Sequence, residues 1–453
     1  MYKKNAWEKY NNEDLNKLFK FGDDYIDFIS NYKTEREITN ISIKLLEENG
    51  FKALNKVDKV NPGDKIYQIN RGKNVCAFII GKDDILDGIN VLGAHIDSPR
   101  LDIKQNPLYE DNELAYLDTH YYGGIIKYQW VARTLAIHGV VCLKDGTTLN
   151  VNIGDNLGDP VFCITDLLPH LGKDKLDKKA NNVIEGEDLD LLIGHQKIKD
   201  IKVKDNILKI LENKYNFSEE DFISSELEIV PEGKARSLGL DNSMVLGYGH
   251  DDRVCAYSSL RALLDTKSVK KTACCILVDK EEIGSVGATG AHSKFFENTI
   301  AELIYKIKGN YNDLYLKKTL TNSYVLSSDV SAGYDPLYKN VYEKNNTCYL
   351  GYGLTFNKYT GARGKSGCND ASAEYLAKLR KILDDNNINY QTSELGKVDQ
   401  GGGGTIAYIL ANLDMNVIDA GVPVLSMHAP SEVISKADLY EAYLGYIAFI
   451  KNM

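Results

Sequence analysis

The sequence has few prolines, no closely paired cysteines and no long apolar run. Its 453 residues include 9 prolines and 8 cysteines, and no two cysteines form a Cys-x-x-Cys pair. Disulfide frameworks and cysteine-based zinc sites need paired spacing, so we expect the cysteines to be small core residues instead. A membrane-spanning helix needs about 20 consecutive apolar residues, a length that no apolar run approaches.

A surplus of positive charge is also missing. The chain has 54 Lys and Arg residues against 64 Asp and Glu residues, a formal net charge of −10. A net-acidic surface repels phosphate groups, so we expect neither nucleic acid nor a membrane as a partner. Residues Met1 to Glu8 turn polar before the apolar core of a secretion signal could form, which predicts a cytoplasmic protein.

Helix and strand patterns alternate near both ends of the chain. Thr34 and Glu37 have the spacing of a capping box, which predicts the start of a helix that Gly50 ends. Further apolar stripes predict helices at 254–264, 371–383, 405–413 and 435–450. Short apolar runs predict buried strands at 75–80, 90–93, 273–278 and 323–327.

The middle of the chain has a different pattern, β-like and rich in charge. A hairpin is predicted at 140–153, with its turn at Asp145-Gly146. Alternating strands and helices on either side favour an α/β sheet. We therefore predict one α/β domain made of residues 1–104 and 244–453, with a second domain of residues 105–243 inserted into it.

Metal-capable side chains follow four of the apolar strand candidates. These side chains are His95, the acidic run Asp279–Glu282, Asp329 and His428. Ligands bind at the carboxyl ends of the strands in open α/β sheets, and imidazole with carboxylate is a common zinc set that also accepts manganese or cobalt. Each residue alone could be a structural histidine or a solvated acid, but four such strand ends favour a metal site. More than three donors indicate two ions that share a carboxylate.

Five sequence blocks occur in order along the chain. They are Gly93–Arg100, Asp251–Arg253, Asp279–Ser285, Ser328–Val330 and Ser426–His428. Together they resemble the aspartyl aminopeptidase/aminopeptidase I family of dinuclear metallopeptidases. The resemblance implies a mixed-sheet α/β catalytic domain with an inserted β-rich dimerisation domain. It also implies an enzyme that removes the N-terminal residue from peptides.

The resemblance further implies two divalent ions per subunit, with zinc expected and manganese or cobalt as alternatives. The implied ligands are His95, Asp251, Glu282, Asp329 and His428. Asp251 is the implied bridge, which shares one ion with His95 and Asp329. It shares the other ion with Glu282 and His428.

Two further acids have implied catalytic roles. Glu281 is the implied general base, which takes a proton from the attacking water and returns it to the leaving amine. Asp97 is expected to accept the second ring N–H of His95 and so fix its tautomer.

Two residues are implied to contact substrate. His170, in the block Asp166–Leu171, matches a histidine that reaches a neighbouring subunit's active site, although a surface histidine is an equal alternative. Lys365 lies where the family places a basic residue near an acidic substrate side chain. The Asp251–Arg253 block differs from that of the animal aspartyl enzymes, so both acidic and neutral N-terminal residues stay open. Members of the family assemble as dodecamers, which implies a homo-oligomer.

Two other functions are consistent with the same residues. A metal-dependent deacylase or carboxypeptidase on this scaffold would use the same water and base. An assembly protein without activity could keep the metals for structure, but it would not need Glu281.

Overall fold

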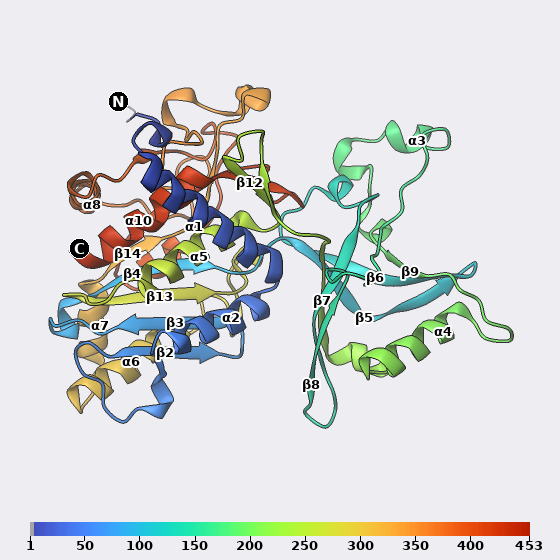
Figure 1. Cartoon of the computed structure of the whole chain (residues 1–453), viewed down its shortest axis with the longest axis horizontal. Helices are drawn as coiled ribbons and strands as arrows, with labels where there is room; N and C mark the ends of the chain where they lie inside the picture. The colour runs from blue at the N-terminus through green and yellow to red at the C-terminus, as the bar shows by residue number, and fades with distance from the viewer. Residues whose placement is uncertain (1–3) are drawn as a thin grey trace. The chain divides into compact units, whose positions relative to one another are not determined.

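The computed structural model describes residues 4–453, so Met1–Lys3, where the polar N-terminal run begins, lie outside the described residues. The chain forms two compact units (Figure 1). Unit 1 contains Met1–Asp97, Ala235–Met427 and Glu432–Met453, and unit 2 contains Ser98–Lys234 and His428–Ser431. The predicted limits of the insertion, 105 and 243, differ from these bounds because strand pairing decides where each unit begins.

Unit 1 is built on a nine-stranded mixed sheet in the order β1-β2-β3-β13-β4-β14-β18-β16-β17. The strands are β1 (Lys52–Ala53), β2 (Lys65–Asn70), β3 (Asn74–Ile79), β13 (Thr272–Val278), β4 (Ile89–His95), β14 (Tyr324–Ser327), β18 (Asn416–Gly421), β16 (Leu354–Asn357) and β17 (Tyr390–Thr392). The four central strands, β13, β4, β14 and β18, run parallel. Their carboxyl ends therefore meet at one edge of the sheet.

Helices cover both faces of this sheet, because its strands are apolar on both sides. Along β13, Cys275 and Leu277 pack into one core while Cys274 and Ile276 pack into the other. The first core lies under α1 (Asn12–Asn31), α2 (Glu35–Glu48), α5 (His250–Leu264), α8 (Ala373–Asp385) and α10 (Lys436–Asn452). The second lies under α6 (Phe295–Lys308), α7 (Asp313–Thr321) and α9 (Ala407–Ala411). Five of the cysteines are buried, and all eight are free thiols.

A five-stranded sheet completes unit 1, in the order β11-β12-β20-β19-β15. Its strands are β11 (Arg236–Leu238), β12 (Met244–Gly247), β20 (Glu432–Ser435), β19 (Pro423–Leu425) and β15 (Ser331–Ala332). Strand β12 leads into α5, and β20 pairs antiparallel with β12. This sheet therefore brings Glu432 close to the start of α5.

Unit 2 is built on a six-stranded antiparallel sheet in the order β8-β7-β10-β5-β6-β9. Its strands are β5 (Arg100–Asp111), β6 (Leu114–Tyr122), β7 (Leu135–Cys142), β8 (Thr148–Ile153), β9 (Leu191–Gly194) and β10 (Ser225–Pro231). Strands β7 and β8 form the predicted hairpin, with Gly146 at a φ of 91° in the turn. The helix α4 (Val203–Ile210) packs on β5, β6 and β9. Within residues 4–453, no helix is long and apolar enough to cross a membrane.

Candidate metal centre

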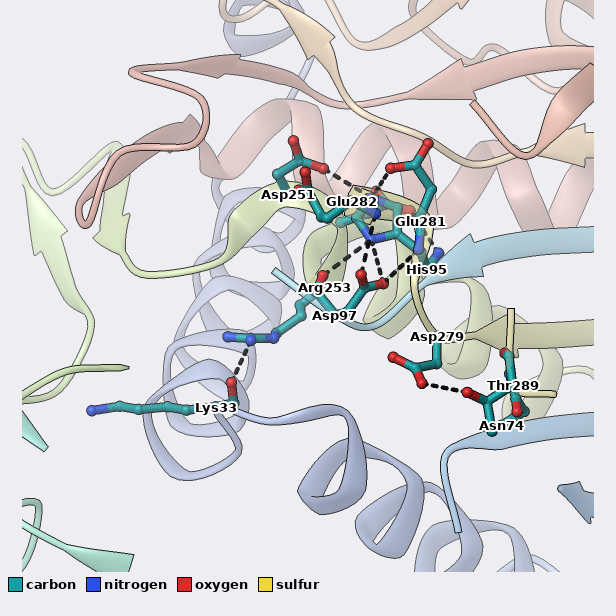
Figure 2. A network of polar contacts seen from close by, with 11 residues as sticks. Lys33, Asn74, His95, Asp97, Asp251, Arg253, Asp279, Glu281, Glu282 and Thr289 are labelled. Carbon is teal, nitrogen blue, oxygen red and sulfur yellow. Dashed lines mark hydrogen bonds and ion pairs between the residues drawn. The ribbon is translucent and has the colours of Figure 1, made fainter. Parts of the chain in front are cut away.

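Three parallel strands deliver acidic and imidazole side chains to one edge of the large sheet. His95 is the last residue of β4 and pairs in register with Val278, the last residue of β13. A 3-10 helix, Glu281–Ile283, follows β13, and Asp329 follows β14. Asp251 comes from the first turn of α5 (Figure 2). Segments more than 150 residues apart in the chain thus meet at this edge because β4 lies between β13 and β14.

His95 is buried, with 1% of its surface exposed, and both ring nitrogens face acids. Its Nδ1 lies 3.1 Å from the carbonyl oxygen of Asp97 and 3.4 Å from Asp97 Oδ1. Its Nε2 lies 3.1 Å from Asp251 Oδ1 and 3.9 Å from Glu281 Oε2. When Nδ1 donates its proton to Asp97, Nε2 faces carboxylate oxygens and must carry either a second proton or a cation.

Asp97 also fixes the segment that carries the two glutamates. Its Oδ1 accepts the backbone N–H of Glu281 and its Oδ2 accepts the backbone N–H of Glu282, each at 3.2 Å. Asp97 is fully buried, so these are charge-assisted hydrogen bonds away from water. One carboxylate therefore orients the ring of His95 and the backbone of both glutamates (Figure 2).

Two groups of side chains are spaced to hold metal ions. One is His95, Asp251 and Glu282, and the other is His95, Asp252 and Asp329. In each group the ligand atoms lie within 4.8 Å of one another. The structure therefore brings together four of the five predicted ligands, and it adds Asp252, to which the sequence analysis gave no role.

The environment of Asp252 tests whether a cation fits. Asp252 is fully buried, and its Oδ2 accepts the backbone N–H of His95 at 3.3 Å. The Cys255 thiol lies beside this carboxylate, but within the described part of the chain no N–H or O–H group donates to its Oδ1. A buried carboxylate oxygen without such a donor is costly unless it is protonated or binds a cation. This oxygen therefore fits a metal ligand.

The pKa values of the clustered side chains also favour a bound cation. Burial raises the pKa of Asp329 well above its usual value, and the nearby carboxylates of Asp252 and Glu281 raise it further. Burial likewise raises the pKa of Asp252. Burial alone would lower the pKa of His95, but hydrogen bonds to Asp251 and Asp97 outweigh it and raise the pKa. The acids outnumber the single imidazole, so the cluster lacks the positive charge that divalent ions supply. Imidazole and carboxylate donors in this set suit zinc.

Glu432 is a second residue that the sequence analysis missed. It is buried, and its Oε2 accepts the backbone N–H of Asp251 at 3.1 Å. Glu432 thereby holds the first turn of α5 in the position from which Asp251 faces His95. The only signal in the sequence is an acid at the start of an apolar strand, which is too common to predict a contact.

Besides Asp97 and Glu281, three predicted residues lie outside both groups. His428 is part of unit 2, where its Nδ1 lies 3.0 Å from the carbonyl oxygen of Gly124. His170 is also in unit 2 and is exposed in a turn. Lys365 is in unit 1, where its ammonium lies 2.8 Å from Asp370 Oδ2 and 3.8 Å from the ring centre of Tyr359.

A sequence model described as Aminopeptidase I zinc metalloprotease (M18) matches residues 28–450. The chain belongs to this family. It is a zinc metalloaminopeptidase, a hydrolase of peptide bonds. The family therefore favours this function over an assembly protein, a deacylase or a carboxypeptidase. The expected mixed α/β fold and the expected family are both confirmed.

Individual M18 proteins resemble the chain over its whole length. The Clostridium acetobutylicum protein named "Probable M18 family aminopeptidase 1" is 59% identical, with 99% of this chain and 98% of that protein covered. The crystal structure of an M18 aminopeptidase from Thermotoga maritima has a TM-score of 0.97 and 44% identity, and the match covers 100% of both chains. The S. cerevisiae mApe1 dodecamer has a TM-score of 0.76 and 21% identity over 95% of both chains, which shows the fold alone.

Proposed function

We propose that the M18 aminopeptidase holds two divalent ions at this edge of the sheet. His95, Asp251 and Asp329 bind one ion, Glu282 and His428 bind the other, and Asp251 bridges them. The observation that carries the proposal is that carboxylates from the segments after β4, β13 and β14 and from the start of α5 converge on one buried imidazole. His428 enters through its place in the Ser426–His428 block rather than through a contact. Bound divalent ions lower the pKa of water and polarise a carbonyl group.

Asp252 is the competing ligand for one of these positions. It belongs with His95 and Asp329 to a group of suitable spacing, and one of its oxygens accepts no N–H or O–H group among residues 4–453. We propose that Asp252 supports the ion pair either as a direct ligand or through its hydrogen bond to the backbone of His95. As a direct ligand it must be ionised.

Glu281 is the proposed general base. It belongs to neither group of ligands, and 15% of its side chain is exposed, so water reaches its carboxylate. Its Oε2 lies 3.9 Å from His95 Nε2, and its backbone N–H is held by Asp97. Glu281 therefore faces the centre without having to bind an ion. It takes one proton from the attacking water and gives that proton to the amine that leaves as the peptide bond breaks.

The proposed substrates are peptides with a free α-amine and an acidic or neutral N-terminal residue. Lys365, which we propose binds an acidic substrate side chain, already forms an ion pair with Asp370. An acidic substrate must therefore displace Asp370 from the lysine, whereas a neutral substrate need not. We propose that neutral residues such as leucine are cleaved faster than aspartate.

We propose that the enzyme works as a homo-oligomer, in which unit 2 makes the contacts between subunits and His170 contacts substrate bound to a neighbour. The S. cerevisiae protein of the same fold is a dodecamer, and we propose the same number here. Exposed apolar side chains next to His170 support an interface, because Leu167, Leu168 and Leu171 are 48%, 48% and 70% exposed. A cytoplasmic location stays a prediction from the sequence.

A substrate panel tests the proposed function. The enzyme is stripped of metal, reloaded separately with zinc, manganese or cobalt, and assayed on fluorogenic leucine, aspartate and glutamate amides. We expect leucine to be hydrolysed fastest, metal content to reach two ions per chain, and N-acetylated copies of each substrate to be left intact. Hydrolysis of the acetylated copies would contradict an aminopeptidase, and full activity with one ion per chain would contradict the dinuclear centre.

A further inference from the structure

Unit 2 contains an apolar cavity of about 290 Å³ that is separate from the metal centre. It lies between one face of the six-stranded sheet and the segment from α4 to the 3-10 helix Glu219–Ser224. The residues that line it come from the sheet, from residues 160–162 after β8, from α4 and from the turns that follow α4. All of them belong to unit 2, so the cavity is complete within that unit.

The wall of the cavity on the sheet side is entirely aliphatic. Residues Ile103, Leu117, Ile137 and Val151 come from four different strands and point to the same face. The helical side contributes Ile207 of α4. Several of these side chains are shielded from solvent and still border open space, since Ile137 is 5% and Val151 is 4% exposed. Apolar walls around such a space recover dispersion contacts when an apolar ligand fills it.

One charged side chain lines the cavity, and it is cationic. Lys214 lies on the exposed π-helical turn Leu211–Tyr215, with its ammonium 5.1 Å from the ring centre of Tyr215. A π-helical turn is rare and often marks a functional position. A lysine at the rim can keep its ammonium in water while its methylene groups extend the apolar wall. The cavity thus has an apolar interior and one positive charge at its edge.

We propose that this cavity binds an unbranched aliphatic carboxylate of medium chain length, such as decanoate. The aliphatic chain fills the space between the sheet and α4, and the carboxylate pairs with Lys214. Charge complementarity selects a carboxylate over an amine or an alcohol of the same length. The site lies beyond the peptidase chemistry, and its proof or failure leaves the metal centre unaffected.

Calorimetric titration of the holoenzyme with sodium hexanoate, octanoate, decanoate and dodecanoate tests the proposal. We expect one saturable site per chain. The affinity should rise about fourfold for each added methylene group until the cavity is full, because each buried methylene contributes a constant increment. Absence of saturable binding, or an affinity that does not change with chain length, would overturn the proposal.

Three controls locate the binding site. Lys214→Glu should weaken decanoate by up to about fivefold, the range of an exposed ion pair, and should strengthen decylamine. Lys209→Glu makes the same charge change on α4 at a lysine that does not line the cavity, so it should leave both affinities unchanged. Val161→Trp fills the mouth from a half-exposed position and should abolish binding while the melting temperature stays close to that of the native chain.

A fatty carboxylate could also bind zinc, so the titration is repeated after chelation of the metal ions. We expect the affinity for decanoate to be the same with and without the ions. Loss of binding on chelation, or binding that survives Val161→Trp unchanged, would assign the carboxylate to another place and overturn the proposal.

Discussion

Asp97 and Glu281 are joined by a hydrogen bond from the Glu281 backbone N–H to Asp97 Oδ1, at 3.2 Å. The same carboxylate lies 3.4 Å from the ring of His95. The proposed base and a proposed ligand therefore share one buried support. Their relative position depends on the charge and shape of a side chain that touches neither ion nor substrate.

Replacing this support should impair the enzyme without unfolding it. Asp97→Asn presents an amide N–H₂ to groups that are themselves donors, so at least one of the three contacts is lost. We expect metal affinity or kcat/KM to fall about 10- to 100-fold, the usual effect of removing such a support. Metal titration and steady-state kinetics measure the two effects, with the exposed Asp58→Asn as a matched control. Native kinetics in Asp97→Asn would show that Asp97 supports neither residue.

Glu281 and Glu282 are adjacent and should respond differently to the same change. Glu281→Gln should keep its metal ions and lose about 10²- to 10⁴-fold in kcat, because only the proton transfer is removed. Glu282→Gln should lose metal ions as well as activity, because an amide oxygen carries no charge. Elemental analysis beside kinetics separates the two outcomes. Loss of metal in Glu281→Gln would make Glu281 a ligand rather than a base.

Metal binding should release protons. In the metal-free chain the pKa values of Asp252 and Asp329 are raised by burial and by neighbouring carboxylates, so these groups hold protons at a higher pH than ordinary aspartates. Ligands must be deprotonated, so affinity should increase as the pH rises through the raised pKa values, and protons should leave on binding. Zinc titrations in two buffers of different ionisation enthalpy count these protons. A binding affinity independent of pH would contradict the cluster.

The raised pKa values also predict how the stability of the folded chain changes with pH. A carboxyl with a raised pKa in the folded chain contributes stability below its unfolded pKa and loses it as the pH rises through the folded value. The metal-free enzyme should therefore become less stable as the pH rises. The metal-loaded enzyme should lose less, because the ions stabilise the charged forms. Melting temperatures of both forms across the pH range check the difference.

Lys365 and Lys358 form a matched pair, since both make ion pairs with Asp370. If Lys365 reads an acidic substrate side chain, Lys365→Met should lower kcat/KM for aspartate and glutamate substrates about tenfold, which corresponds to about 1.4 kcal/mol, and leave leucine unchanged. Lys358→Met should not change the ratio between these substrates. An equal loss on all substrates in Lys365→Met would reject a selective role.

Local sequence patterns predicted several elements well. The capping box of Thr34 and Glu37 forms as expected at the start of α2, and the hairpin at 140–153 forms as β7 and β8. The apolar run 273–278 lies within β13. The capping box and the hairpin depend on contacts between residues close in the chain, so the pattern alone was sufficient. Strand β13 pairs with the distant β3 and β4, and only its apolar composition indicated it. The strand-end acids were visible for the same reason, because each follows an apolar run directly.

Contacts between distant residues could not be predicted in this way. Asp252 was visible only as the second acid of a pair, and its burial depends on how α5 packs behind β4. Glu432 reaches the backbone of Asp251 because β20 pairs with β12, a neighbour that no local pattern indicates. The cavity of unit 2 depends on the packing of α4 on a sheet that is contiguous only after folding.

The amino-acid sequence by itself determined the family, since the blocks around His95, Asp251 and Glu281 identify it and predict the donor types. The tertiary structure alone decided how they act together. Strand order places β4 between β13 and β14, and this order lets one buried carboxylate, Asp97, hold an imidazole and two backbone amides at once. The physical reason is that the chemical type of a side chain is a property of one residue. Its burial and the charges around it arise only when distant segments of the chain pack together.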